Sequence, residues 1–140
     1  MRQRRSTDPL VLSAWAFMLP AFLWALSGCI AESFIVALAA FSAVVYHRRQ
    51  EPTGTILQID QVLAMGALVL TLERYYVTAM RLDVWAVAVV GIGVVAVQIY
   101  GVNRAAYVLA DVEVYESVHL SWHVLVLIGQ CVLALAVLFA

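Results

Sequence analysis

Two histidines, His119 and His123, stand four residues apart at the start of a long apolar stretch near the end of the chain. On a helix, side chains four residues apart lie one above the other on the same face, so both imidazoles can reach a single ion. This is a spacing that metal sites use. Polar rings at the mouth of a lipid-facing segment are costly unless they have a partner. The pair is therefore a candidate metal site that needs further ligands from elsewhere in the chain.

The composition is that of an integral membrane protein. Of the 140 residues, 65% are hydrophobic and 12% are charged, and the mean hydropathy is +0.96. A soluble domain is about half apolar and about one quarter charged. The net charge is -1, and the eight basic residues are arginines placed between apolar runs. No nucleic acid partner is predicted, because no basic patch is present to bind a polyanion.

Five segments approach the roughly twenty apolar residues that a membrane-spanning helix needs. They are Leu10–Ser27, Glu32–Tyr46, Thr55–Tyr75, Val84–Tyr100 and Ser117–Phe139. We therefore predict an all-α integral membrane bundle of about five transmembrane helices, which forms one domain over residues 1–140. Pro20 in the first segment predicts a kink there. Merging the first two segments across Gly28 would give a four-span alternative.

The arginines predict the orientation of the chain, because short cytoplasmic loops collect positive charge. With five spans, six arginines fall on one side of the membrane, and only Arg74 and Arg81 fall on the other. The six are Arg2, Arg4, Arg5, Arg48, Arg49 and Arg104. We predict a multi-pass protein with a cytoplasmic N-terminus and an exoplasmic C-terminus. The four-span alternative would lose this charge bias.

Two further polar residues lie at the same predicted depth as the histidine pair. His47 closes the second segment on that side, and Asp60 lies in the first turns of the third. Three imidazoles with a fourth position left to water are typical of a catalytic zinc site. Zinc lowers the pKa of its bound water to about 7, which supplies a hydroxide nucleophile. Asp60 could assist that water, hydrogen-bond a ligand histidine, or bind the metal directly.

These residues resemble the CREST superfamily of membrane hydrolases, which includes alkaline ceramidases, the PAQR receptors, haemolysin III-like proteins and the myomaker branch. The resemblance is carried by Tyr46-His47, Asp60 and the run His119-Leu-Ser-Trp-His123. It implies a seven-helix fold, zinc held by three histidines, a nearby aspartate and serine, and hydrolysis of a lipid amide or ester. His47, His119 and His123 match the metal ligands, and Asp60 matches the acidic position.

The chain departs from that family in two places. Members place the serine four residues before the first histidine, where this chain has Ala43, so Ser42 is the candidate for the serine. Ser42 would share the His47 face only if a π-bulge changed the register of the helix. Members also have three helices between the aspartate and the last histidines, where this chain has one. A five-helix bundle would leave the site open to lipid or need a second copy, as a homo-oligomer, to close it.

Three classes of function are consistent with the sequence. The first is a zinc-dependent hydrolase that uses a zinc-bound water to cleave an amide or ester bond of a lipid substrate within the membrane bilayer. The second is a non-catalytic receptor or scaffold subunit with a structural or vestigial metal. The third is a haem protein, in which His47 would have to face His119 or His123 across the haem, since the latter two share a helix face.

Overall fold

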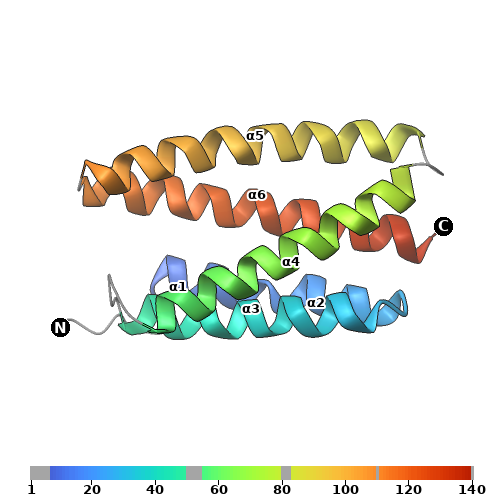
Figure 1. Cartoon of the computed structure of the whole chain (residues 1–140), viewed down its shortest axis with the longest axis horizontal. Coiled ribbons are helices and arrows are strands. Elements are labelled where there is room, and N and C mark those ends of the chain that lie inside the picture. The colour runs from blue at the N-terminus through green and yellow to red at the C-terminus, as the bar shows by residue number, and fades with distance from the viewer. Residues whose placement is uncertain (1–6, 50–54, 80–82, 110, 140) are drawn as a thin grey trace.

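The computed structural model describes residues 7–49, 55–79, 83–109 and 111–139, and helices account for most of them (Figure 1). The helices are α1 (Pro9–Ala16), α2 (Met18–Leu26), α3 (Ile30–Arg49), α4 (Thr55–Ala79), α5 (Asp83–Val108) and α6 (Val112–Leu138). These ranges contain no strand. The predicted all-α fold is therefore confirmed.

The first two helices form one span that is broken at Phe17. Asp8 caps the start of α1 with its side chain. Pro20 causes the break, because it lacks an N–H group and its ring crowds the carbonyl of Ala16 one turn earlier. Together, the 18 residues Pro9–Leu26 are long and apolar enough to cross a membrane. The kink expected at Pro20 is thus present as a short interruption three residues before it.

A glycine turn separates this first span from α3. Gly28 has a φ of 76°, a left-handed conformation that costs least for glycine. Cys29 N donates to Trp24 O at 2.9 Å, and Gly28 N donates to Ala25 O at 3.1 Å. This is the Schellman pattern that ends a helix. The chain therefore turns back at this point, and the alternative in which the first two spans are merged is wrong.

Four helical stretches of the described residues are long and apolar enough to cross a membrane. They are Pro9–Leu26, Ile30–Arg49, Thr55–Val77 and Val112–Leu138. The fifth predicted segment lies within α5, whose 26 residues would extend about 39 Å at 1.5 Å per residue, more than the hydrocarbon core of a bilayer. Large apolar side chains such as Phe22, Phe34 and Val62 are exposed on the outside of the bundle. The protein is an integral membrane helical bundle.

The helices run back and forth along one long axis (Figure 1). α5 and α6 lie side by side, α3 packs beside α1 and α2, and α4 crosses diagonally from the α3 layer toward α5. At one end of the bundle α1, α4 and α6 begin and α3 and α5 end. We call it the histidine end because His47, His119 and His123 lie there. Helix α6 ends at the opposite end.

The described arginines divide between the two ends of the bundle. Arg48 and Arg49 end α3 and Arg104 is near the end of α5, and all three are exposed at the histidine end. Arg74 lies near the far end of α4. The other four lie outside the described residues: Arg2, Arg4, Arg5 and Arg81. The placement of the histidine end on the cytoplasmic side stays a prediction.

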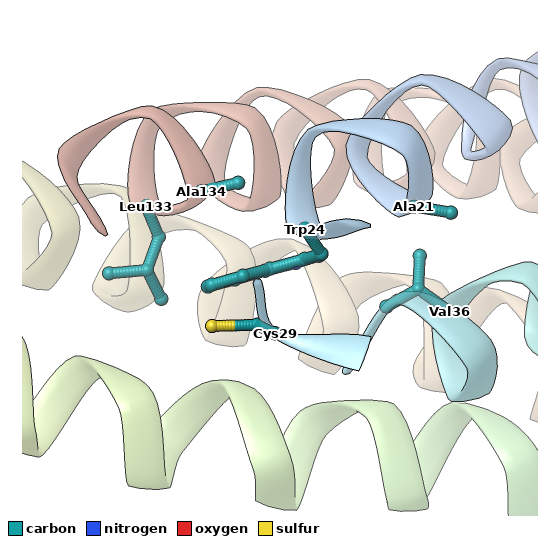
Figure 2. Close-up of a cluster of buried hydrophobic side chains, with 6 residues drawn as sticks. All are labelled: Ala21, Trp24, Cys29, Val36, Leu133 and Ala134. Carbon is teal, nitrogen blue, oxygen red and sulfur yellow. The ribbon is translucent and has the colours of Figure 1, made fainter. Parts of the chain in front are cut away.

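A buried apolar cluster holds α2, α3 and α6 together (Figure 2). Its centre is the Trp24 indole, which is fully buried between α6 and the start of α3. The small residues Ala21 and Ala134 let α2 and α6 approach closely, which is how membrane helices commonly pack. Leu133 of α6 and Val36 of α3 complete the contact. This cluster fixes how α6 sits against α3, and so it positions the histidines that both helices carry.

Candidate metal centre

The histidine pair lies inside α6 rather than at its start. Asp111 caps the helix by accepting a hydrogen bond from Val114 N at 3.1 Å, so α6 begins two turns before His119 and earlier than the Ser117 start that the sequence predicted. The rings of His119 and His123 are 4.7 Å apart between centroids. The expectation that the two imidazoles share one helix face is confirmed.

His47 reaches the pair from the last turn of α3. Its ring centroid lies 5.1 Å from that of His119 and 5.1 Å from that of His123. One ring nitrogen from each of the three histidines falls within 4.8 Å of the other two. Around one ion, nitrogens at the usual zinc distance are about 3.4 Å apart, so a modest ring rotation closes the site. The three histidines could therefore hold one metal ion.

Two of the three histidines are buried and His119 is half-buried, although all three rings are polar. His47 and His123 are each only 5% exposed. Aromatic side chains pack against the histidine group. The Phe17 ring meets His123 edge-on at 5.7 Å between centroids, and the Tyr115 ring stacks on His119 at 5.1 Å. The break between α1 and α2 falls at Phe17, which places that ring against the site. Burial of this kind needs compensating partners for the imidazoles.

Two partners come from residues that the sequence did not single out. Ser13 Oγ lies 2.8 Å from His123 Nδ1, and Asn103 Nδ2 lies 3.2 Å from His119 Nδ1. Ser13 lies one turn into α1 at the histidine end. Its depth in the predicted span matches that of the histidines, so the sequence alone could have identified it as a candidate partner. Asn103 lies beyond Tyr100, where the predicted span ends, and only the continuation of α5 brings it to the site.

Ser42 and Asp60 are brought together with each other. Ser42 Oγ donates to Asp60 Oδ1 at 2.8 Å and also lies 3.0 Å from Ala39 O. Helix α3 is α-helical throughout Ile30–Arg49, without the π-bulge, so Ser42 faces α4 rather than sharing the His47 face. No carboxylate of the described residues joins the group of nitrogens within 4.8 Å. Asp60 is thus engaged by Ser42 and is not a member of the histidine group.

Gln130, which continues the polar face of α6 beyond His123, has a structural role. Its Oε1 accepts a hydrogen bond from Trp24 Nε1 at 2.8 Å, and its Nε2 donates to Thr71 Oγ1. Gln130 is 6% exposed, and these bonds satisfy both ends of its amide. They tie α2, α4 and α6 together in the interior. The polar face of α6 therefore ends in a network of hydrogen bonds that packs three helices together.

The arrangement as a whole presents three imidazole nitrogens in an apolar bundle, and a separate serine–aspartate pair joins α3 and α4. Imidazole is a common ligand of zinc, copper, iron and nickel. The chemistry of the donor set therefore suits a transition metal ion. Comparisons of this chain with protein-family models, with curated proteins and with solved structures found no match.

Proposed function

We propose that the protein is a membrane-embedded, zinc-dependent hydrolase that cleaves an amide or ester bond of a lipid. The observation that carries the proposal is the group of three imidazole nitrogens within 4.8 Å, contributed by His47 of α3 and by His119 and His123 of α6. Structural zinc sites usually have four protein ligands, whereas catalytic sites have three and leave one position for water or substrate. Three histidines match the catalytic pattern.

Zinc bound here would act as a Lewis acid and lower the pKa of a coordinated water to about 7. The chain itself supplies the groups that handle protons. Ser42 stands five residues before His47, about 7.5 Å deeper along α3, and its hydroxyl holds the Asp60 carboxylate. A carboxylate that reaches the attacking water, directly or through one further water, would accept its proton and return it to the leaving group.

The membrane setting favours a lipid as the substrate. Four helical stretches are apolar enough to cross the bilayer, and the histidine end lies at the end of the bundle, where a lipid's amide or ester bond meets the headgroup region. The exposed apolar side chains of α3 and α4, such as Phe34, Phe41 and Val62, offer a surface for an acyl chain. Such a lipid could place its carbonyl near the metal while its chain stays in the bilayer.

A non-catalytic receptor or scaffold is the second candidate. It is favoured by one observation: Asp60 binds Ser42 and lies outside the nitrogen group. In that case, a metal would link α3 to α6 without turnover. Haem is disfavoured because the His47 ring makes edge contacts with both other rings, whereas axial imidazoles stand on opposite faces of a porphyrin.

The test combines metal analysis with lipid hydrolysis by the full chain purified in detergent. We expect about one zinc per chain, release of fatty acid from a ceramide or a phospholipid in mixed micelles, and loss of turnover in Asp60→Asn with zinc retained. Zinc without turnover on either lipid would favour the scaffold. A wild-type protein with no zinc above background, even after incubation with Zn²⁺, would overturn the proposal.

A further inference from the structure

Two of the three histidines are contacted at Nδ1 by a residue from a different helix. Ser13 of α1 contacts His123, and Asn103 of α5 contacts His119. A neutral imidazole has one N–H group and one lone pair, so the partner at Nδ1 decides whether the lone pair is on Nε2. We propose that Ser13 and Asn103 are positioning residues that hold His123 and His119 as Nδ1–H tautomers, with Nε2 directed at the ion. This inference rests on the metal centre proposed above.

The hydrogen bonds of Ser13 set the tautomer of His123. The Ser13 hydroxyl has one proton, and it donates that proton to Leu10 O at 2.9 Å within the first turn of α1. With its proton on Leu10 O, the Ser13 oxygen accepts a hydrogen bond from His123 Nδ1, 2.8 Å away. In this arrangement Nδ1 carries the hydrogen. The lone pair of His123 is on Nε2, which is the nitrogen left to bind a metal.

Asn103 performs the same role for His119 after a half-turn of its amide, because the structure places the donor Nδ2 at His119 Nδ1. Asn103 is 7% exposed, and its Oδ1 has no hydrogen-bond partner among the described residues. The two ends of an amide have nearly the same shape, and a half-turn exchanges them. With Oδ1 toward His119 Nδ1, the carbonyl accepts a hydrogen bond and Nε2 keeps its lone pair. With Nδ2 there, Nε2 would carry a hydrogen and could not bind a metal.

Substitutions at Asn103 separate these two orientations. A carboxylate can only accept, so Asn103→Asp keeps a bond from Nδ1–H but cannot donate to Nδ1. Asn103→Leu removes the contact in either case. At the other site, Ser13→Ala removes the acceptor and Ser13→Thr retains it. The matched control is Ser121→Ala on α6, because Ser121 is exposed and its hydroxyl donates to the Ser117 carbonyl of its own helix.

The first measurement is zinc affinity, from competition with a chromophoric chelator on the full chain in detergent. We expect Ser13→Ala and Asn103→Leu to bind Zn²⁺ about 10–100-fold more weakly. Asn103→Asp, Ser13→Thr and Ser121→Ala should bind as wild type does or more tightly. Circular dichroism confirms that each variant is folded. Unchanged affinity in both Ser13→Ala and Asn103→Leu would overturn the inference while leaving the zinc centre in place.

The second measurement needs no metal. Nitrogen-15 NMR of the histidine-labelled, metal-free protein reports which ring nitrogen carries the hydrogen. We expect Nδ1–H for His123, and Nδ1–H for His119 in Asn103→Asp. If the wild type binds no zinc, yet His123 shows Nδ1–H and His119 shows it in Asn103→Asp, the proposed function fails and the positioning roles are supported. An Nε2–H tautomer at His123, or at His119 in Asn103→Asp, would overturn the inference.

Discussion

Ser42 Oγ and Asp60 Oδ1 lie 2.8 Å apart and join α3 to α4 within the apolar part of both helices. A hydrogen bond to a charged group contributes about 1.5–3 kcal/mol to stability. Neither residue belongs to the group of three histidine nitrogens. The pair can therefore be altered without removing a metal ligand, which allows helix packing, metal binding and turnover to be measured separately.

Replacing Ser42 by alanine should lower stability and leave metal binding intact. Ser42→Ala removes the hydroxyl that donates to the half-buried Asp60, so we expect a loss of about 1–3 kcal/mol in the free energy of unfolding. Denaturant titration in detergent, followed by circular dichroism, measures that loss. Zinc content measured on the same samples should match the wild type. Loss of zinc in Ser42→Ala would show that the pair reaches the ion after all.

Metal removal should destabilise the wild type through its link between α3 and α6. An ion that binds only the folded state adds about 2.7 kcal/mol when its concentration is 100 times Kd. His47 is the one histidine of the group that α3 supplies, so His47→Ala should break this link. We expect a chelator to lower the Tm of the wild type and to leave that of His47→Ala unchanged. Equal shifts in both proteins would mean that the ion does not bridge the two helices.

The sequence predicted the grouping of the three histidines better than the residues that surround them. Helical periodicity places His119 and His123 on one face. Because successive spans alternate in direction, His47 falls at the same end of the bundle. Ser13 and Asn103 could not be predicted as partners, because their contacts depend on how α1 and α5 are rotated about their axes, which only packing decides. The hydropathy pattern also predicted too early an end for α5, because the backbone hydrogen bonds of a helix continue through polar residues such as Asn103.

The ion pair at the other end of the bundle should show the cost of an unpaired buried charge. Arg74 Nε donates to Glu32 Oε1, and Glu32 is 4% exposed, with its Oε2 unpartnered among the described residues. Arg74→Met would leave that carboxylate alone. We expect a loss of about 1–3 kcal/mol, below the 3–5 kcal/mol of a fully buried pair, because the Arg74 side chain is 40% exposed.

The double variant Glu32→Gln/Arg74→Met is the control for this prediction. It removes the charge together with its partner, so it should be more stable than Arg74→Met alone. Chemical unfolding of the wild type, of Glu32→Gln, of Arg74→Met and of the double variant measures the coupling between the two residues. A double variant no more stable than Arg74→Met would mean that the aliphatic part of the Arg74 side chain, rather than its charge, supports α3.

Two glycines should respond to alanine with opposite signs. At Gly28 and at Gly101 an added Cβ would meet nothing within 4 Å, so the backbone alone decides the outcome. Gly28 has a φ of 76°, where alanine costs about 1–2 kcal/mol. Gly101 lies inside α5, where alanine gains about 0.5–1 kcal/mol. The Tm of thermal unfolding should therefore be lower than that of the wild type for Gly28→Ala and higher for Gly101→Ala. The Tm of Gly28→Asn should lie between those of Gly28→Ala and the wild type, because asparagine tolerates the left-handed region. A Gly28→Ala protein as stable as the wild type would mean that the turn between α2 and α3 can adopt another backbone conformation at no cost.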